Sequence, residues 1–163
     1  MTFAVGDKAS YPVRGIVEVM GIEEREIGGS RLSFYVLRAL ETQDKVLVPT
    51  QSARERGLRA LVEPAAAPAV YALLDVPGTL DVKEAPNRRH RHLKERLDTG
   101  SVEEAAAVYR DLQRLREKKV LSFGEVRMLD TARARLATEL SLSTQQPVEE
   151  VAKRLESRFP AAA

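Results

Sequence analysis

One stretch of the sequence organises the rest of the chain: Pro86-Asn87-Arg88-Arg89-His90-Arg91-His92-Leu93-Lys94-Glu95-Arg96. It contains five basic side chains and two histidines within about three turns of a helix. Pro86 suits the first helical position, because the N–H that proline lacks would have no partner there. Leu93 and Leu97 are four residues apart and indicate the buried side. The stretch therefore predicts a basic helix from about Pro86 to Asp98.

The charges of this helix fall on more than one of its faces. Arg88 and Arg91 share one face, whereas Arg89 is spaced to share a face with Leu93. A helix that begins at such a cluster presents backbone N–H groups and guanidinium groups together, an arrangement that suits phosphate. The same stretch is equally consistent with a solvated basic surface that aids solubility. By itself it does not decide between these two readings.

The sequence on the N-terminal side of this helix has a different pattern. Up to about Leu61 the apolar residues alternate with period two between glycines, which favours antiparallel strands. Gly28-Gly29-Ser30 predicts a hairpin turn, and Pro49 marks an edge strand. The predicted strands cover residues 9–11, 16–22, 23–27, 31–40 and 45–48, with a short extended piece at 58–62. Short antiparallel strands with short loops predict a small curled sheet or barrel.

From about Glu63 onward the apolar residues recur at helical spacing. The predicted helices cover residues 64–74, 86–98, 102–119, 123–141 and 147–159. Ser101 with Glu104, and Ser122 with Glu125, have the spacing of capping boxes at two of the helix starts. The inner face predicted for the fourth helix consists of Val126, Leu129, Ala132, Leu136 and Leu140. We therefore expect an α+β chain with a β domain at 1–62 and an all-α domain at 63–163.

Composition limits the possible functions. The 163 residues are 44% hydrophobic and 31% charged, which is typical of a soluble globular protein. The net charge is only +2, so any affinity for nucleic acid must come from local clusters. The chain has no cysteine, which fits a reducing cytoplasm and excludes disulfides and thiolate metal sites. Neither a signal peptide nor a membrane span is expected from the apolar pattern.

No group of residues in the sequence suggests catalysis. His90 and His92 lack the spacing of a metal site, and the phosphate-binding glycine motifs and the nucleophile motif Gly-x-Ser-x-Gly are absent. Acidic residues near the helix starts are explained by the helix dipole. We therefore expect a protein that is not an enzyme and that has no cofactor and no metal ion.

Several segments resemble the CarD/CdnL family of bacterial RNA polymerase-binding transcription regulators. The resemblance covers nearly the whole chain and rests on the order and spacing of the segments. The clearest are Val5-Gly6-Asp7-Lys8, Phe34-Tyr35-Val36-Leu37-Arg38, Asn87-Arg88-Arg89, Arg110-Asp111-Leu112, Leu121-Ser122-Phe123-Gly124-Glu125 and Met128-Leu129-Asp130-Thr131-Ala132-Arg133. The CdnL branch, which has these two modules and no further DNA-binding tail, fits best.

The resemblance implies that the N-terminal domain is a small Tudor-like antiparallel β-barrel that binds the RNA polymerase β subunit. It also implies that the C-terminal all-α domain contacts promoter DNA with little sequence preference and stabilises the open complex. By position in the family, the polymerase-binding residues would be Arg25, Ile27, Leu47, Val48 and Pro49. The DNA-binding residues would be Pro86, Asn87, Arg88, Arg89, Arg91 and Lys94. We expect a cytoplasmic, nucleoid-associated monomer that does not bind membranes.

Two positions depart from the family pattern. Family members often have a basic residue at the position of Leu47, and they have a DNA-wedging tryptophan at the position of Pro86, whereas this chain has no tryptophan. Proline offers no indole to stack on a base. The protein could therefore be a weaker activator, a divergent paralogue, or a competitor that occupies polymerase without activating it. The remaining alternatives are a protein-interaction adaptor and an enzyme of unknown type.

Overall fold

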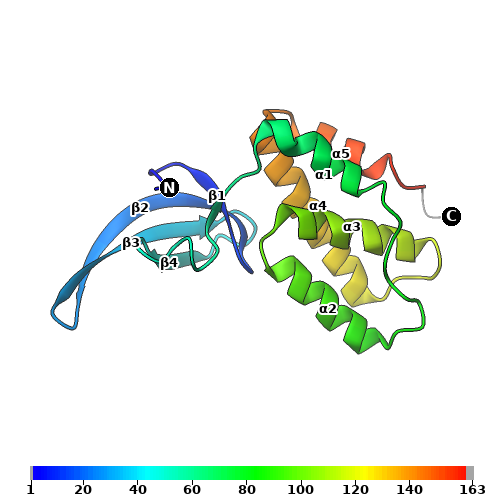
Figure 1. The fold of residues 1–163 in the computed structure, drawn as a ribbon, viewed down its shortest axis with the longest axis horizontal. Helices are drawn as coiled ribbons and strands as arrows, with labels where there is room; N and C mark the ends of the chain where they lie inside the picture. The colour runs from blue at the N-terminus through cyan, green and yellow to red at the C-terminus, as the bar shows by residue number, and fades with distance from the viewer. Residues whose placement is uncertain (1, 161–163) are drawn as a thin grey trace. The chain divides into compact units, whose positions relative to one another are not determined.

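The computed structural model describes residues 2–160, and the chain divides into two compact units, Met1–Leu61 and Val62–Ala163 (Figure 1). The first unit is an antiparallel sheet and the second is helical, which confirms the predicted α+β class. Within residues 2–160 no helix combines the length and the apolarity that a bilayer-spanning segment requires.

The N-terminal unit is a five-stranded sheet with the strand order β4-β3-β2-β1-β5. The strands are β1 (Lys8–Tyr11), β2 (Gly15–Ile27), β3 (Ser30–Ala39), β4 (Lys45–Pro49) and β5 (Arg59–Ala60). β4 and β5 lie at opposite edges, so the sheet is open. Of the two predicted alternatives the sheet is confirmed, and the closed Tudor-like barrel implied by the resemblance is wrong. The physical reason is the shortness of β5, whose two residues pair with β1 and do not reach β4.

Strand β2 is continuous, although its sequence predicts two strands that meet at Ile22. Its register against β3 shifts once, because Val19 pairs with Leu37 and Gly21 pairs with Val36. Met20 is the extra residue of this β-bulge, and it interrupts the alternation of side chains between the two faces. The interruption makes one bulged strand look like two strands in the sequence.

The turn between β2 and β3 confirms the hairpin predicted from the glycine pair. Ile27 pairs with Ser30, which leaves a two-residue loop. Gly28 and Gly29 have φ angles of 59° and 81°, as a type I′ turn requires at both central positions. This turn has the twist of the flanking strands and sets the register of the longest hairpin in the unit.

One face of the sheet carries the hydrophobic core of this unit. The buried side chains are Ala9, Val17, Val19, Tyr35, Leu37, Ala39, Val48, Ala53 and Leu58. Strand residues that pair directly lie on the same face of an antiparallel sheet, so the register assigns each strand residue to one side.

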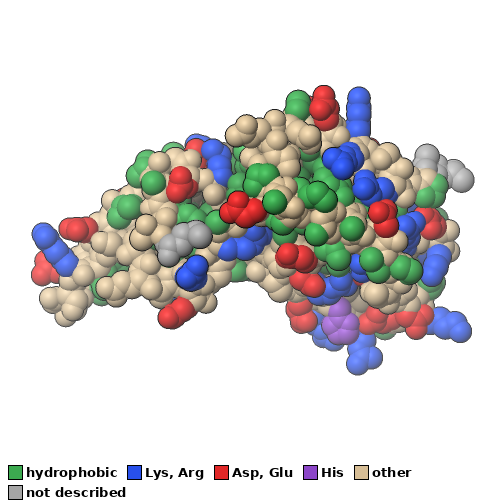
Figure 2. Space-filling model, turned by 45° about the horizontal axis from the view of Figure 1, so that its top comes forward, with side chains coloured by type: hydrophobic (Ala, Val, Ile, Leu, Met, Phe, Trp, Pro, Cys, Tyr) green, Lys and Arg blue, Asp and Glu red, His purple; other side chains and the backbone are tan. Residues whose placement is uncertain are grey.

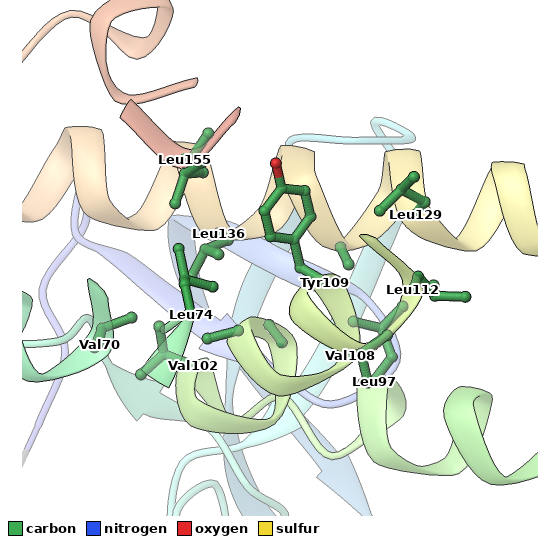
Figure 3. Packing of buried hydrophobic residues seen from close by; sticks show 14 of the residues in the cluster. Val70, Leu74, Leu97, Val102, Val108, Tyr109, Leu112, Leu129, Leu136 and Leu155 are labelled. Carbon is green, nitrogen blue, oxygen red and sulfur yellow. The ribbon is translucent and has the colours of Figure 1, made fainter. Parts of the chain in front are cut away.

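Up to residue 160, the C-terminal unit consists of a short 3₁₀ turn and five α-helices. They are η1 (Pro64–Ala66), α1 (Ala67–Leu73), α2 (Pro86–Asp98), α3 (Val102–Arg116), α4 (Phe123–Thr144) and α5 (Val148–Glu156). Helix α3 packs against α1, α2 and α4, and α5 packs on α4 (Figure 1). Leucine, valine and alanine side chains fill the space between them (Figure 3). Tyr109 lies edge-on to Phe159 with ring centroids 5.6 Å apart. The observed α2 has the bounds predicted from its sequence.

Helix α4 begins with a complete capping box, since the Ser122 hydroxyl accepts from the Glu125 backbone N–H and the Glu125 carboxylate accepts from the Ser122 backbone N–H. The second predicted box forms only in part. Ser101 caps α3, but the Glu104 carboxylate accepts from Arg96 instead. Val126 is exposed, which contradicts its predicted inward position, because Glu125 occupies the inward place in that turn.

Candidate functional site

On the solvent-facing side of α2, two basic side chains have no partner among residues 2–160. Arg88 and Arg91 are exposed, and within residues 2–160 neither side chain makes a hydrogen bond or an ion pair. They are three residues apart and therefore project from the same side. Figure 2 shows Lys and Arg side chains gathered around a histidine, which marks α2 because both histidines of the chain lie on this helix.

The helix starts without a side chain cap. Ala85 is the N-cap residue, Pro86 is the first helical residue, and Asn87 follows it, exposed. The first turn of α2 contains no acidic residue. The partial positive charge of the helix start therefore adds to the charge of Arg88 and Arg91. This region has the chemistry to bind phosphate groups.

Two other side chains of this helix have acidic neighbours within the chain. The exposed ammonium group of Lys94 pairs with Asp98 one turn later. His92 Nδ1 lies 3.2 Å from a carboxylate oxygen of Glu84. Lys94 therefore takes the predicted exposed position, but an anion would compete there with Asp98.

Arg89 requires a correction, because it does not face the solvent. Its side chain is 2% exposed, and its Nε donates to Glu125 Oε2 at 2.9 Å. Its Nη1 donates to the backbone oxygen of Glu84 at 3.0 Å. The prediction that Arg89 contacts DNA is therefore wrong in this structure. The physical reason is the helical spacing that places it on the same face as the buried Leu93.

Glu125 is the carboxylate that receives the buried arginine. Burial raises its pKa, but hydrogen bonds from Lys119, the Ser122 backbone and Arg89 outweigh burial and lower the pKa to about 2. Lys119 Nζ donates to Glu125 Oε1 at 2.7 Å, whereas Arg89 donates to the other oxygen of the same carboxylate. Glu125 is thus ionised and links α2, α4 and the loop between α3 and α4.

A second ionic cluster connects α2 to α3. The buried carboxylate of Asp111 accepts from Arg96 Nη1 at 3.1 Å, from Arg110 Nε at 3.0 Å and from Thr79 Oγ1 at 2.8 Å. Leu93 and Leu97 enter the core beside it. The basic helix is therefore fixed on its inner side by apolar packing and by two buried carboxylates, and Arg88 and Arg91 project from a rigid element.

Four of the five residues predicted to bind polymerase share one face of the N-terminal sheet. Arg25 pairs with Leu32 across β2 and β3, Leu47 pairs with Val36 across β4 and β3, and paired residues lie on one face. Ile27 and Pro49 are two residues further along their strands and lie on the same side. We call this the outer face.

Val48 is the exception. It pairs with Tyr35 on the opposite face and is 1% exposed, within the core of the sheet. The prediction that its side chain contacts polymerase is therefore wrong, because alternation along β4 turns it inward. Its strand nevertheless lies at an edge of the sheet, so the backbone of β4 has a side without a neighbouring strand within residues 2–160.

The outer face also contains residues that the sequence analysis did not select. Leu32, Phe34 and Val36 alternate along β3, are partly exposed and form an apolar strip between the predicted residues. Their period-two spacing was the available signal. Glu18 and Arg38 lie next to this strip, and hydrogen bonding and charge from Lys8 lower the pKa of Glu18 below its usual value.

Two family models match the chain. The model of the CarD-like/TRCF RID domain matches residues 3–62, and the model of the CarD C-terminal domain matches residues 69–156. "Putative transcription factor YdeB" of Bacillus subtilis is 29% identical over 140 residues, which cover 86% of this chain and 91% of that protein.

Two solved structures are similar to the N-terminal part. CdnLNt from Myxococcus xanthus has 47% sequence identity and a TM-score of 0.33, with 38% of this chain and 87% of that chain covered. The solution NMR structure of the 72-residue N-terminal domain of Myxococcus xanthus CarD has 34% sequence identity and a TM-score of 0.32. The match covers 36% of this chain and 79% of that chain. Since the two family models together match most of the chain, this protein belongs to the CarD/CdnL family of transcription regulators.

Proposed function

We propose that this protein is a non-catalytic transcription regulator that binds the β subunit of RNA polymerase through its N-terminal sheet and contacts promoter DNA through α2. In this function it stabilises the open complex. The observation that carries the proposal is the pair of exposed arginines, Arg88 and Arg91, on a helix whose other side is fixed by buried contacts.

The DNA contact has the properties of backbone binding. Guanidinium groups bind phosphate oxygens in pairs of hydrogen bonds, and contacts to phosphate carry no direct sequence information. Two free arginines and an uncapped helix start make a small contact, so we expect weak binding to DNA by the protein alone. This accords with a net charge of only +2.

Binding to polymerase would compensate for the weak affinity of α2 for DNA. The outer face of the sheet combines the partly exposed strip of Leu32, Phe34 and Val36 with the exposed Arg25 and Leu47. An apolar centre with polar residues around it is the composition of a protein-binding surface. Attachment to polymerase raises the local concentration of α2 near DNA, so a weak contact is sufficient.

The proposal is tested with Arg88→Glu combined with Arg91→Glu. We expect the lifetime of the open complex on a promoter to fall at least about tenfold toward its value without the protein, since two phosphate contacts become repulsive. Binding to the isolated polymerase β lobe should not change. Lys153→Glu with Arg154→Glu is a matched control, because it makes the same change of net charge on α5.

The same experiment addresses the alternative of an adaptor or competitor. An adaptor that does not use DNA would leave the lifetime of the open complex the same in the Arg88/Arg91 variant and in the unmodified protein. A competitor that occupies polymerase without activating it would leave that lifetime no longer with the unmodified protein than with polymerase alone. Either result would refute the proposed contact between α2 and DNA.

A further inference from the structure

Phe123 is a large aromatic side chain that the fold does not bury. It is the first residue of α4 and is 77% exposed, and it is the one aromatic among the exposed large hydrophobic residues of the described chain. Removing a phenylalanine side chain from water is favourable. The exposed ring is therefore available to a partner outside the chain.

The start of α4 is held beside the start of α2. Glu125, two residues after Phe123, accepts the hydrogen bond from the buried Arg89. On the other side, a Cβ atom placed on Gly124 would lie 3.4 Å from His90 Cε1. Figure 1 shows the yellow beginning of α4 alongside the bright green α2. Phe123 is therefore next to α2, the helix that contains Arg88 and Arg91. The buried Arg89–Glu125 pair connects α2 to the start of α4.

The position of the ring is further defined by a cation. The guanidinium carbon of Arg127 lies 5.8 Å from the centroid of the Phe123 ring, and Arg127 is exposed. The complete capping box of Ser122 and Glu125 fixes the backbone at the base of the ring. The result is an exposed aromatic ring that has one guanidinium near its face and two more on the neighbouring helix.

We infer that Phe123 is a second DNA contact, which stacks on an unpaired base of the strand whose phosphates are bound by Arg88 and Arg91. The inference rests on the proposed function, since it requires α2 to lie on DNA. Proteins bind single-stranded DNA by this combination of cationic groups along the backbone and aromatic faces for the bases. The surrounding charge is cationic and therefore favours nucleic acid over an apolar protein side chain.

A stacked base must be free of its partner, so the contact gives a preference among DNA structures. Arg88 and Arg91 contact phosphates that duplex and single-stranded DNA both have, whereas the ring gains a partner only where bases are unpaired. The full-length protein should therefore bind a duplex with a single-stranded extension more tightly than a blunt duplex of equal length.

The test compares Phe123→Ala with the unmodified chain on these two DNAs at low salt. We expect about tenfold weaker binding of the variant to the DNA with the extension, and a change of less than about twofold on the blunt duplex. Because the side chain is exposed, the variant should keep its melting temperature. Binding to the polymerase β lobe is measured in parallel and should be unchanged.

A direct readout comes from Phe123→Trp, since the chain has no tryptophan of its own. Stacking on a base should quench the new fluorescence when the DNA with the extension is added, but not when the blunt duplex is added. Val148→Trp is the matched control, because Val148 is also an exposed first residue of a helix. Its fluorescence should remain constant with both DNAs.

The outcomes separate the inference from the function on which it rests. If the unmodified protein binds neither DNA and polymerase stimulation survives Arg88→Glu with Arg91→Glu, the DNA role as a whole is wrong. If the unmodified protein binds both DNAs but Phe123→Ala binds them equally well, or loses affinity for both to the same extent, base stacking by Phe123 is refuted and the DNA role stands. A loss of polymerase binding in Phe123→Ala would also refute it and would assign the ring to a protein interface.

Discussion

Arg89 Nε donates to Glu125 Oε2 at 2.9 Å, and both side chains are buried in the helical unit. This single pair connects the basic helix α2 to the capping box of α4. It gives Arg89 a role different from that of its neighbour Arg88, although both belong to the same basic run. Arg88 projects toward the solvent, whereas Arg89 sets the place of the helix from which Arg88 projects.

Arg89→Ala should destabilise the helical unit. The substitution leaves the buried carboxylate of Glu125 without its arginine, and removing one partner of a buried pair typically costs about 3 kcal/mol or more. Arg88→Ala is the matched control and should change the free energy of unfolding by less than about 0.5 kcal/mol, since its side chain is exposed. Denaturant unfolding followed by circular dichroism measures both. Equal stabilities of the two variants would contradict the structural role of Arg89.

The low pKa of Glu125 predicts how stability depends on pH. Because the folded pKa is about 2 and the unfolded value is near 4.5, the ionised carboxylate stabilises the folded state above about pH 4.5. This contribution is lost as the pH falls toward 2. Glu125→Gln cannot ionise, so the stability advantage of the unmodified protein over this variant should shrink by about 2 kcal/mol between pH 5 and pH 3.

Unfolding of both proteins at a series of pH values checks this prediction, and the difference between the two curves removes the contribution of other carboxylates. Asp130→Asn, which changes an exposed residue on the same helix, is the control and should give a difference that varies much less with pH. A constant difference between Glu125→Gln and the unmodified protein would mean that Glu125 is not held ionised by its neighbours.

The sequence was sufficient to predict the bounds of α2, because Pro86 and the spacing of Leu93 and Leu97 are local signals. It did not reveal the partner of Arg89, since Glu125 is 36 residues away and the capping box already accounts for an acid at that position. The spacing of Arg89 and Leu93 did indicate a buried face. A buried arginine must be paired, so this spacing could have been used to look for a carboxylate in another helix.

In the sheet, local signals predicted the hairpin at Gly28 and Gly29 but not the open edges. Barrel closure depends on whether the first and last strands in the sheet order reach each other, which no local pattern records. The assignment of Val48 failed for a related reason. Neighbouring residues of a strand face opposite sides, so a run of three adjacent residues cannot all lie on one surface.

The salt dependence of DNA binding should rank the basic residues of α2. Arg91→Ala should reduce the slope of log affinity against log salt by about 0.9, which is the value for one lost phosphate contact on duplex DNA. Lys94→Ala should reduce the slope by less, because Lys94 is already paired with Asp98. Arg25→Ala in the N-terminal unit is the control and should not change it. Slopes that fall equally for Arg91→Ala and Lys94→Ala would show that the ion pair opens on DNA.

The two faces of the N-terminal sheet should differ in their contribution to polymerase binding. Leu47→Glu introduces a charge on the outer face, where it would be desolvated against polymerase, and we expect at least about tenfold weaker binding to the β lobe. Ile22→Glu is the matched control, because Ile22 is 51% exposed and pairs with Tyr35 on the opposite face. It should bind within about twofold of the unmodified protein. Since both side chains are substantially exposed, the two variants should unfold at similar temperatures, so a difference in affinity reports the face that binds polymerase. The opposite order of affinities would place polymerase on the other side of the sheet.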